Sequence, residues 1–234
     1  MTLGRPHVHH RSTDSTNERA RALASAGAPH GTLVTAAEQS AGRGRQGRTW
    51  VAPPGSALLA SLVVRDLGER TLLLPLAAAV AVAEACEELA SVECAIKWPN
   101  DVWIDGRKLA GILVEGRPQE GWAVLGMGVN TRTEEFPEEL RETATSLALA
   151  APETGPVEPG ALLAPLLRAL ERLLAGDPEE ILAAWRGRDA LAGSPVRWRD
   201  GEGTAEGISD DGALLVRTES GVVELDAGEV HLLR

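Results

Sequence analysis

The chain has 234 residues, of which 44% are hydrophobic, and a formal net charge of -11. This length and apolar content suffice for one sizeable core, or for a core with a small appended domain. The acidic balance argues against nonspecific nucleic-acid binding, which needs many cationic side chains to neutralise phosphates. Two cysteines, no apolar leader and no long uncharged apolar run predict a cytoplasmic protein that neither enters nor crosses a membrane.

Hydrophobic patterning and turn residues predict both strands and helices over the first 190 residues. In chain order, the expected strands are 7–11, 31–37, 56–64, 93–98, 101–105, 108–115 and 122–130. The expected helices are 16–26, 71–90, 137–150, 159–175 and 178–190. Asp105-Gly106, between two of these strands, is typical of a type I′ hairpin turn.

A change of composition at Gly193-Ser194-Pro195 separates the last forty or so residues from the rest. Short β-like runs follow at 196–199, 203–209, 213–218, 222–226 and 229–233. Closely spaced short strands with turn pairs between them predict a small barrel. Because so few residues build only a marginal core, we expect this unit, residues 191–234, to dock on the larger domain, residues 1–190.

The segment GRGRQGRTW at 42–50 concentrates three arginines and three glycines on an otherwise acidic protein. Glycines let backbone N–H groups approach an anion closely, and guanidinium groups offer paired donors that match phosphate or carboxylate oxygens. The segment also fits the G-x-G-x-x-G dinucleotide pattern, but Pro53-Pro54-Gly55 prevents the helix that this pattern requires. We interpret the segment as an anion-binding loop, with a merely solvated flexible loop as the alternative.

A second motif is KWPND at 97–101, followed by KLAGILVE at 108–115. Ordinary turn chemistry explains the Pro-Asn-Asp part alone. It does not explain why two cationic side chains, Lys97 and Lys108, flank a carboxylate at the end of a strand. Together with the arginine loop, this set supplies positive charge for an anionic substrate and a carboxylate for a metal ion.

These motifs, in this order, resemble those of the biotin–protein ligases. Two smaller matches are Ser-Thr-Asn at 15–17, which opens the first expected helix, and GMGVN at 126–130. The resemblance covers nearly the whole chain. It implies an α+β fold: a mixed β-sheet catalytic domain with helices packed on it, plus a small C-terminal SH3-like β-barrel. Some members carry an N-terminal winged-helix domain and repress the biotin operon; here the motifs begin at residue 15, so we expect a ligase without operator binding.

The resemblance implies an ATP-dependent, AMP-forming reaction in two steps. The biotin carboxylate attacks the ATP α-phosphate, giving biotinyl-5′-AMP and pyrophosphate, and a lysine of a biotin carboxyl carrier domain then attacks the mixed anhydride. ATP and biotin are the implied substrates, Mg²⁺ is the implied metal, and a biotin-dependent carboxylase supplies the partner. A monomer and a homodimer remain equally open.

The resemblance also implies roles for individual residues, which we state as expectations. Those expected to bind biotin are Ser15, Thr16, Asn17, Gln39, Arg43, Gly44, Arg45, Lys108, Gly111 and Leu113. Those expected to bind ATP are Arg45, Arg48, Trp50, Asn100, Lys108 and Asn130. The expected catalytic residues are Arg45, Lys108 and Asp101, and Asp101 is also the expected Mg²⁺ ligand. Simple packing of Trp50 and a purely capping role for residues 15–17 are structural alternatives.

Three other functions are kept as alternatives. A lipoate or octanoate ligase shares the catalytic fold but takes an acyl chain without a ureido head, so competition by lipoate against biotin would distinguish it. A noncatalytic biotin or nucleotide sensor would bind ligand without making pyrophosphate. A nucleic-acid-binding regulator would show steep salt dependence, and the acidic balance argues against it.

Overall fold

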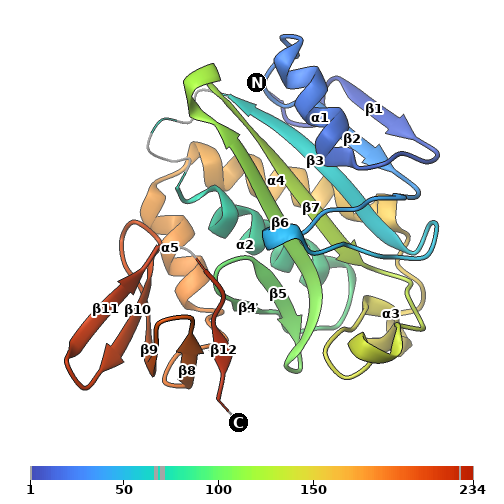
Figure 1. The fold of residues 1–234 in the computed structure, drawn as a ribbon. Coiled ribbons are helices and arrows are strands. Elements are labelled where there is room, and N and C mark those ends of the chain that lie inside the picture. The colour runs from blue at the N-terminus through green and yellow to red at the C-terminus, as the bar shows by residue number, and fades with distance from the viewer. Residues whose placement is uncertain (1, 66–67, 69–71, 227, 234) are drawn as a thin grey trace.

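The computed structural model describes residues 2–65, 68, 72–226 and 228–233. Seven strands form one sheet in the order β1-β2-β3-β7-β6-β5-β4. Their bounds are β1 His7–His10, β2 Leu33–Ala36, β3 Ala57–Arg65, β4 Ala95–Lys97, β5 Asp101–Ile104, β6 Arg107–Arg117 and β7 Trp122–Asn130. The pair β1 and β2 is parallel, and the other neighbours in this sheet are antiparallel. The expected mixed sheet of an α+β fold is therefore confirmed (Figure 1).

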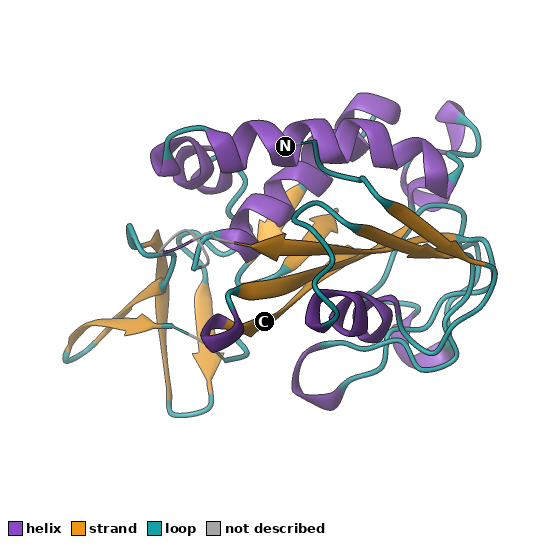
Figure 2. Ribbon diagram, turned by 90° about the horizontal axis from the view of Figure 1, so that it is seen from above, coloured by secondary structure: helices purple, strands orange, loops and turns teal. Residues whose placement is uncertain are grey.

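Helices cover both faces of this sheet, as the view from above shows (Figure 2). The α-helices are α1 Thr16–Ser25, α2 Leu74–Leu89, α3 Leu147–Ala150, α4 Leu163–Ala175 and α5 Pro178–Arg186. Short 3-10 turns are η1 Arg45–Gly47, η3 Pro118–Glu120, η4 Glu138–Leu140, η5 Pro152–Thr154 and η6 Pro159–Leu162. Among the described residues, no helix has the length and apolarity that crossing a bilayer requires.

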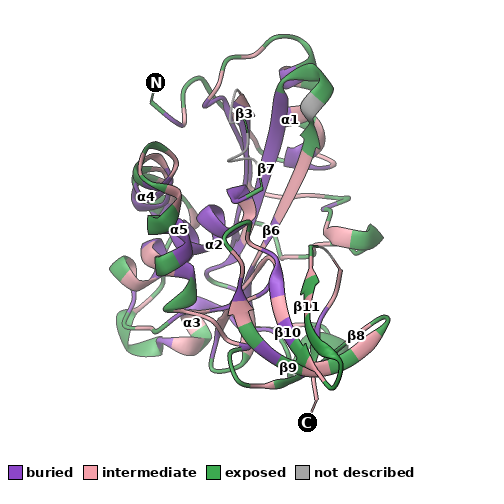
Figure 3. Ribbon diagram, turned by 90° about the vertical axis from the view of Figure 1, so that its left-hand side faces the viewer, coloured by how far each residue is buried: buried purple, intermediate pink, exposed green. Residues whose placement is uncertain are grey.

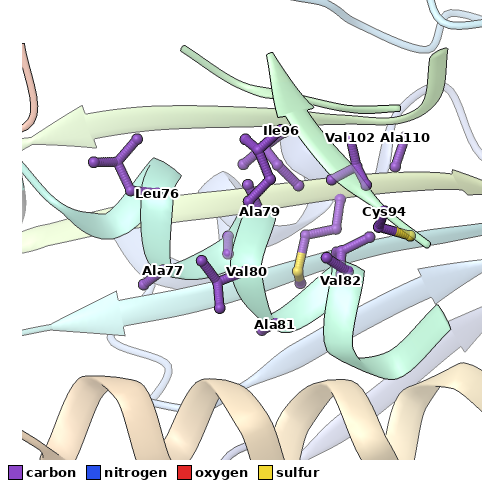
Figure 4. Close-up of a cluster of buried hydrophobic side chains, with 14 of the residues drawn as sticks. Leu76, Ala77, Ala79, Val80, Ala81, Val82, Cys94, Ile96, Val102 and Ala110 are labelled. Carbon is purple, nitrogen blue, oxygen red and sulfur yellow. The ribbon is translucent and has the colours of Figure 1, made fainter. Parts of the chain in front are cut away.

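One face of the sheet packs on α2 and forms the main core. Because side chains alternate along a strand, every second residue of β3, β6 and β7 points to this face. Leu62, Ile112 and Leu125 lie there, each at most 2% exposed. Helix α2 is itself almost wholly buried, between the sheet and α4, which explains why its sequence is apolar on all sides. Figure 4 shows its small side chains against Ile96, Val102 and Ala110.

The opposite face of the same strands packs on α1 near one end. Ala20 and Ala24 of α1 form a smaller buried cluster with Val34, Val63 and Val124. Because side chains alternate between the two faces, neighbouring residues of one strand lie in different environments. The part of this face that α1 leaves uncovered holds the site described below.

Most expected elements are present with shifted ends. Pro75 falls in the first turn of α2, where proline is tolerated, and the expected start of this helix at Thr71 lies outside the described residues. Asp105 and Gly106 both have positive φ, 49° and 73°, as the hairpin turn requires.

The helix expected at 137–150 is wrong. That segment contains only η4 and the one-turn α3. Its middle instead pairs with the start of β6: the Lys108 N–H donates to the Thr143 carbonyl at 2.7 Å, and the Thr145 N–H donates to the Lys108 carbonyl at 2.8 Å. Hydrogen bonding to the sheet therefore prevails over the helical preference of this segment.

The helix expected at 178–190 ends early, at Arg186, for the same reason. Beyond it, the Ile96 N–H donates to the Arg188 carbonyl and the Ala190 N–H donates to the Ile96 carbonyl, so these residues extend the sheet beside β4. The first turn expected at 159 is 3-10 rather than α-helical.

The C-terminal strands form a separate five-stranded antiparallel sheet, in the order β11-β10-β9-β8-β12. Their bounds are β8 Pro195–Trp198, β9 Gly201–Ile208, β10 Leu214–Thr218, β11 Gly221–Leu225 and β12 His231–Leu232. Much of this unit is exposed (Figure 3). It docks on the larger part, as expected: the Trp98 indole N–H donates to the Gly212 carbonyl at 3.0 Å, and Arg186 pairs with Asp210 at 3.0 Å.

Candidate functional site

A cavity of about 570 Å³ lies on the face of the sheet that α1 only partly covers. Every site residue expected from the sequence lines this one cavity. These residues are Ser15, Thr16, Asn17, Gln39, Arg43, Gly44, Arg45, Arg48, Trp50, Asn100, Asp101, Lys108, Gly111, Leu113 and Asn130. Four segments far apart in the sequence thus meet: the start of α1, the arginine loop, the β4–β6 hairpins and the end of β7.

One end of the cavity is polar and uncharged. The Thr16 backbone N–H and hydroxyl both donate to Gln39 Oε1, at 2.7 and 2.9 Å. This fixes the Gln39 amide with its oxygen toward α1. Ser15 takes the N-cap position with an extended backbone, but its side chain makes no capping hydrogen bond. The alternative in which Ser15 serves only as a cap therefore finds no support.

The Asn17 side chain is held from three sides beside this polar end. Ser61 Oγ lies 2.6 Å from Asn17 Oδ1 and 2.8 Å from Thr16 Oγ1. The Asn17 amide donates to Glu115 Oε2 at 2.9 Å. Gly126 leaves room for it, because a Cβ at that position would lie only 2.2 Å from Asn17 Oδ1.

Glycines also form the floor of the cavity at its centre. The β-sheet register places Asp101, Gly111 and Gly128 opposite one another in one row across β5, β6 and β7. The Trp50 ring lies against this row: a Cβ on Gly128 would be 2.7 Å from its Cε2, and one on Gly111 would be 3.1 Å from its Cζ3. Trp50 Nε1 is buried and has no hydrogen-bond partner among the described residues.

The arginine loop closes on itself as a short hairpin in front of the sheet (Figure 1). The Gly44 N–H donates to the Arg48 carbonyl at 2.7 Å, and the Trp50 N–H donates to the Gly42 carbonyl at 3.0 Å. At the tip, Gln46 and Gly47 have positive φ, 54° and 77°. Glycine adopts this conformation freely, which explains one of the three glycines in the motif.

Each arginine of the loop contacts an oxygen from a different part of the chain. Arg43 pairs with Glu18 of α1 and, at 3.2 Å, with Glu115 of β6. Arg48 pairs with Glu229, close to the C-terminus.

Arg45 reaches the KWPND motif and the C-terminal unit. It donates to Asn100 Oδ1 at 3.2 Å and to the Gly228 carbonyl at 3.3 Å. Burial lowers the pKa of the Arg45 guanidinium below its ordinary value, while the negative charges of Asp101 and Glu229 oppose this shift. The group remains a cation near neutral pH, because arginine starts from so high a pKa.

A lysine and a carboxylate meet at the other side of the glycine row. Lys108 Nζ lies 2.7 Å from Asp101 Oδ1 and 5.9 Å from the centre of the Trp50 ring. This ion pair is the contact that the structure gives Asp101 Oδ1, which is buried. Lys97 lies 5.2 Å from the Trp103 ring centre, and burial lowers the pKa of its ammonium group, opposed by Asp101.

Two asparagines complete this side of the cavity. The Asn100 side chain donates to the Ile112 carbonyl at 2.7 Å, which ties the KWPND turn to β6. Asn130 donates to the Thr145 carbonyl at 3.1 Å, while its Oδ1 is buried without a partner among the described residues. An unpaired buried oxygen such as Asn130 Oδ1 is uncommon in folded proteins, and at a cavity wall it favours a ligand or ion as the missing partner.

Several residues of the site were missed by sequence reasoning. Ser61 is a lone hydroxyl within the apolar run of β3, which was the available signal. Gly126 and Gly128 follow the same alternation that places Gly111 and Leu113 at the cavity. Glu229 carried no signal, because only the tertiary structure brings the C-terminal segment to the arginine loop.

The arrangement combines neutral hydrogen-bonding side chains, which Glu115 supports at Asn17, with the cations of the arginine loop and the Lys108–Asp101 ion pair. The neutral side chains suit a polar ligand head without charge, and the cations suit anions such as carboxylates and phosphates. Among the residues that the structure describes, no three His, Cys, Asp or Glu side chains gather as a metal-binding group.

Comparison with known proteins gives consistent matches to both parts of the chain. Residues 10–131 match the Biotin/lipoate A/B protein ligase family, and residues 192–233 match the Biotin protein ligase C terminal domain. The chain is 35% identical over 245 residues to the bifunctional ligase/repressor BirA of Bacillus subtilis, covering 98% of this chain and 75% of that protein. It is 36% identical to the biotin–[acetyl-CoA-carboxylase] ligase of Paracoccus denitrificans, covering 93% and 97%.

A solved structure agrees in fold and extent. The biotin protein ligase from Aquifex aeolicus in complex with biotin and ATP superposes with a TM-score of 0.84 at 30% identity, covering 98% of this chain and 99% of that one. The sequence matches and the shared fold indicate the same family. All the expected site residues also line one cavity, as that family predicts. The chain belongs to the biotin protein ligase family.

Proposed function

We propose that this protein activates biotin with ATP and transfers it to a lysine of a biotin carboxyl carrier domain. The observation that carries the proposal is a single cavity lined both by neutral hydrogen-bonding side chains and by the cationic side chains of the arginine loop and Lys108. Biotin has a neutral ureido head and a carboxylate tail, so one ligand matches both sets of side chains. Relatives named as biotin ligases support the same conclusion.

At the neutral end, Ser15, Thr16, Asn17 and Gln39 bind the ureido head. The Thr16–Gln39 and Asn17–Glu115 hydrogen bonds fix which atoms of these side chains donate and which accept, so the wrong head group would leave buried polar atoms unpaired. Gly111 and Leu113 line the path of the apolar chain. This composition favours biotin over lipoate or octanoate, which carry no ureido group.

The arginine loop binds the anionic groups: Arg43, Gly44 and Arg45 hold the biotin carboxylate and the adenylate phosphate, and Arg48 holds the ATP phosphates. Trp50, Asn100 and Asn130 contact the nucleotide side. In the first step, a carboxylate oxygen attacks the α-phosphorus and the bond to the β-phosphate oxygen breaks, releasing pyrophosphate. Lys108 lies where both anions must meet and neutralises the charge that builds up between them.

Asp101 is the proposed residue for Mg²⁺. The residues fit such an ion, because the Asp101 carboxylate lines the cavity and a hard cation prefers carboxylate oxygens. When bound, Mg²⁺ would supply positive charge to the phosphate oxygens. Asn130 Oδ1, which is buried without a partner among the described residues, also belongs to a residue that lines this cavity.

In the second step, the amine of the carrier lysine attacks the acyl carbon of biotinyl-5′-AMP. The carbon–oxygen bond to the phosphate breaks, AMP leaves, and the amine loses a proton as the amide forms. Residues 228–232 form one wall of the cavity, so we assign the C-terminal unit, residues 191–234, a part in enclosing the nucleotide above the catalytic part, residues 1–190. Both cysteines are buried and free, which favours a reducing cytoplasm as the compartment.

The test is biotin-dependent exchange of pyrophosphate into ATP with Mg²⁺, with lipoate and octanoate as control acids. Exchange with biotin alone supports the proposal, and addition of a chelator should then abolish it. Exchange with lipoate instead would assign the protein to the sister activity. Biotin binding without exchange would contradict catalysis and favour a sensor.

A further inference from the structure

Glu115 occupies a place in the site that the proposed mechanism does not use. It lies on β6, its side chain is 21% exposed, and its two oxygens contact two different parts of the cavity wall. Oε2 accepts from the Asn17 amide at 2.9 Å, and Oε1 pairs with Arg43 Nη2 at 3.2 Å. One carboxylate thus connects the polar end of the cavity to the arginine loop.

The contact with Asn17 decides which way its amide faces. An asparagine amide has nearly the same shape in its two flipped orientations, so only its hydrogen-bond partners select one. Ser61 Oγ can donate or accept and therefore fits either orientation. An ionised carboxylate only accepts, so Glu115 requires the amide nitrogen on its side and leaves Oδ1 toward Ser61.

The contact with Arg43 joins the loop to the body of the protein. Arg43 also pairs with Glu18, and Arg21 lies 2.9 Å from Glu18 and 3.9 Å from Glu115. These four side chains alternate in charge, from α1 through the loop to β6. Arg43 is the first arginine of the motif and forms a β-bridge with Thr49, so this network holds the loop near the base of its hairpin.

We infer that Glu115 is a positioning residue that sets the amide orientation of Asn17 and holds the arginine loop through Arg43. Recognition of the ligand head and closure of the loop then depend on the same carboxylate. The inference rests on the proposed function, in that Asn17 is taken to bind the biotin head.

The first test is the Glu115→Gln variant, because a glutamine amide has one accepting end and one donating end. It can accept from Asn17 or from Arg43, but it cannot accept from both. Since a charge-assisted bond is lost, we expect the dissociation constant for biotin, measured by calorimetry, to rise about tenfold. The KM for ATP in the exchange reaction should stay within about twofold, and trypsin should cleave the arginine loop faster.

Two single variants serve as controls. Glu88→Gln also removes the acid of an ion pair, with Arg168, but on the far surface of α2, and should change neither measurement. Glu18→Gln removes the ion pairs with Arg43 and Arg21 but no contact of Asn17, so it should speed cleavage and weaken biotin binding less than Glu115→Gln does. If Glu18→Gln weakened biotin binding as much as Glu115→Gln, the role assigned to the Asn17 contact would be wrong.

A double variant that exchanges the amide and the carboxylate tests the contact by a gain in biotin affinity, which loss of folding cannot produce. Asn17→Asp places two carboxylates against each other, whereas Asn17→Asp combined with Glu115→Gln restores a donor facing an acceptor. The double variant should therefore bind biotin at least about threefold more tightly than Asn17→Asp alone, a coupling typical of residues in contact.

Unchanged biotin affinity in Glu115→Gln, or no coupling in the double variant, would overturn the inference. Faster cleavage with unchanged affinity would do the same, since Glu115 would then be a loop contact only. Biotin binding and cleavage are measured without turnover, so a wild-type protein that fails to exchange pyrophosphate would contradict the proposed function and leave the test of Glu115 valid.

Discussion

The two faces of the seven-stranded sheet are built from the same strands but have different roles. Toward α2, β3, β6 and β7 present large apolar side chains that are at most a few per cent exposed. Toward the cavity, the intervening residues include glycines, a serine, an asparagine and a glutamate beside the apolar Leu59 and Leu113. Leu125 and Gly126 are neighbours in the chain, yet one fills the core and the other makes room for Asn17.

This difference separates stability from function along a single strand. Burial of apolar area on the α2 face supplies most of the free energy of folding. Glycine and half-buried polar groups on the cavity face contribute little to it but create space and hydrogen-bonding patterns. Substitutions on the two faces should therefore have different signatures, from the largest expected effect to the smallest.

The largest effect should come from Lys108→Ala on the cavity side. We expect the rate of biotin-dependent pyrophosphate exchange to fall about 100- to 1,000-fold, because one preorganised charge at the reacting anions is lost. The melting temperature, measured by circular dichroism, should hardly change. Arg107→Ala, one residue earlier on β6, is the matched control, and a Lys108→Ala protein that kept a tenth of the wild-type rate would contradict the assignment.

On the core face, Leu125→Ala should lower stability instead. Leu125 is fully buried, so we expect the free energy of unfolding in urea to fall by about 2–5 kcal/mol. The folded protein should keep its KM for biotin within about twofold. A large change in KM with little loss of stability would show that the two faces are not separable.

Gly126→Ala, one residue further along β7, should instead weaken biotin binding more than it lowers stability. The added Cβ would lie 2.2 Å from Asn17 Oδ1, so the Asn17 side chain must move. We expect the dissociation constant for biotin to rise about tenfold, equivalent to about 1.4 kcal/mol, with a smaller loss of stability than in Leu125→Ala. Calorimetric titration with biotin measures the effect, and tight binding would argue against Asn17 as a contact of the head group.

The smallest effect should come from Ser61→Ala, which removes one hydroxyl behind the polar end of the cavity. Loss of a single buried hydrogen-bond partner costs about 1 kcal/mol, so biotin binding should weaken about fivefold. Ser56→Ala serves as control, because Ser56 is also a buried hydroxyl but contacts Pro53 and Thr133 rather than the cavity. Equal weakening in both variants would indicate a general loss of order.

Local patterns predicted much of the fold, and they failed where long-range pairing intervened. The seven strands of the main sheet and α1, α2 and α4 follow from periodicity and turn residues, because their local preference agrees with their final environment. The segment 137–150 has a helical pattern, but Thr143 and Thr145 pair with Lys108 more than thirty residues away. No local signal in that segment announces this partner.

The site residues likewise divide into those that local sequence features predicted and those that only long-range contacts bring to the site. Motifs identified the arginine loop, Lys108 and Asp101, since charged and glycine-rich clusters are visible in any sequence. The alternation rule placed Gly111 and Leu113 on the cavity face. Glu229 and Ser61 escaped notice because one lies at the far end of the chain and the other is a single polar residue in an apolar strand.

The sequence by itself therefore determined most of the elements, the alternation of the strands and the chemical nature of the anion-binding groups. These depend on residue type and on spacing along the chain. The tertiary structure decided which oxygen each arginine contacts, how the Asn17 amide faces and that the C-terminal segment closes one wall of the cavity. Those features depend on hydrogen-bond and ion-pair distances of about 3 Å between segments that only folding brings together.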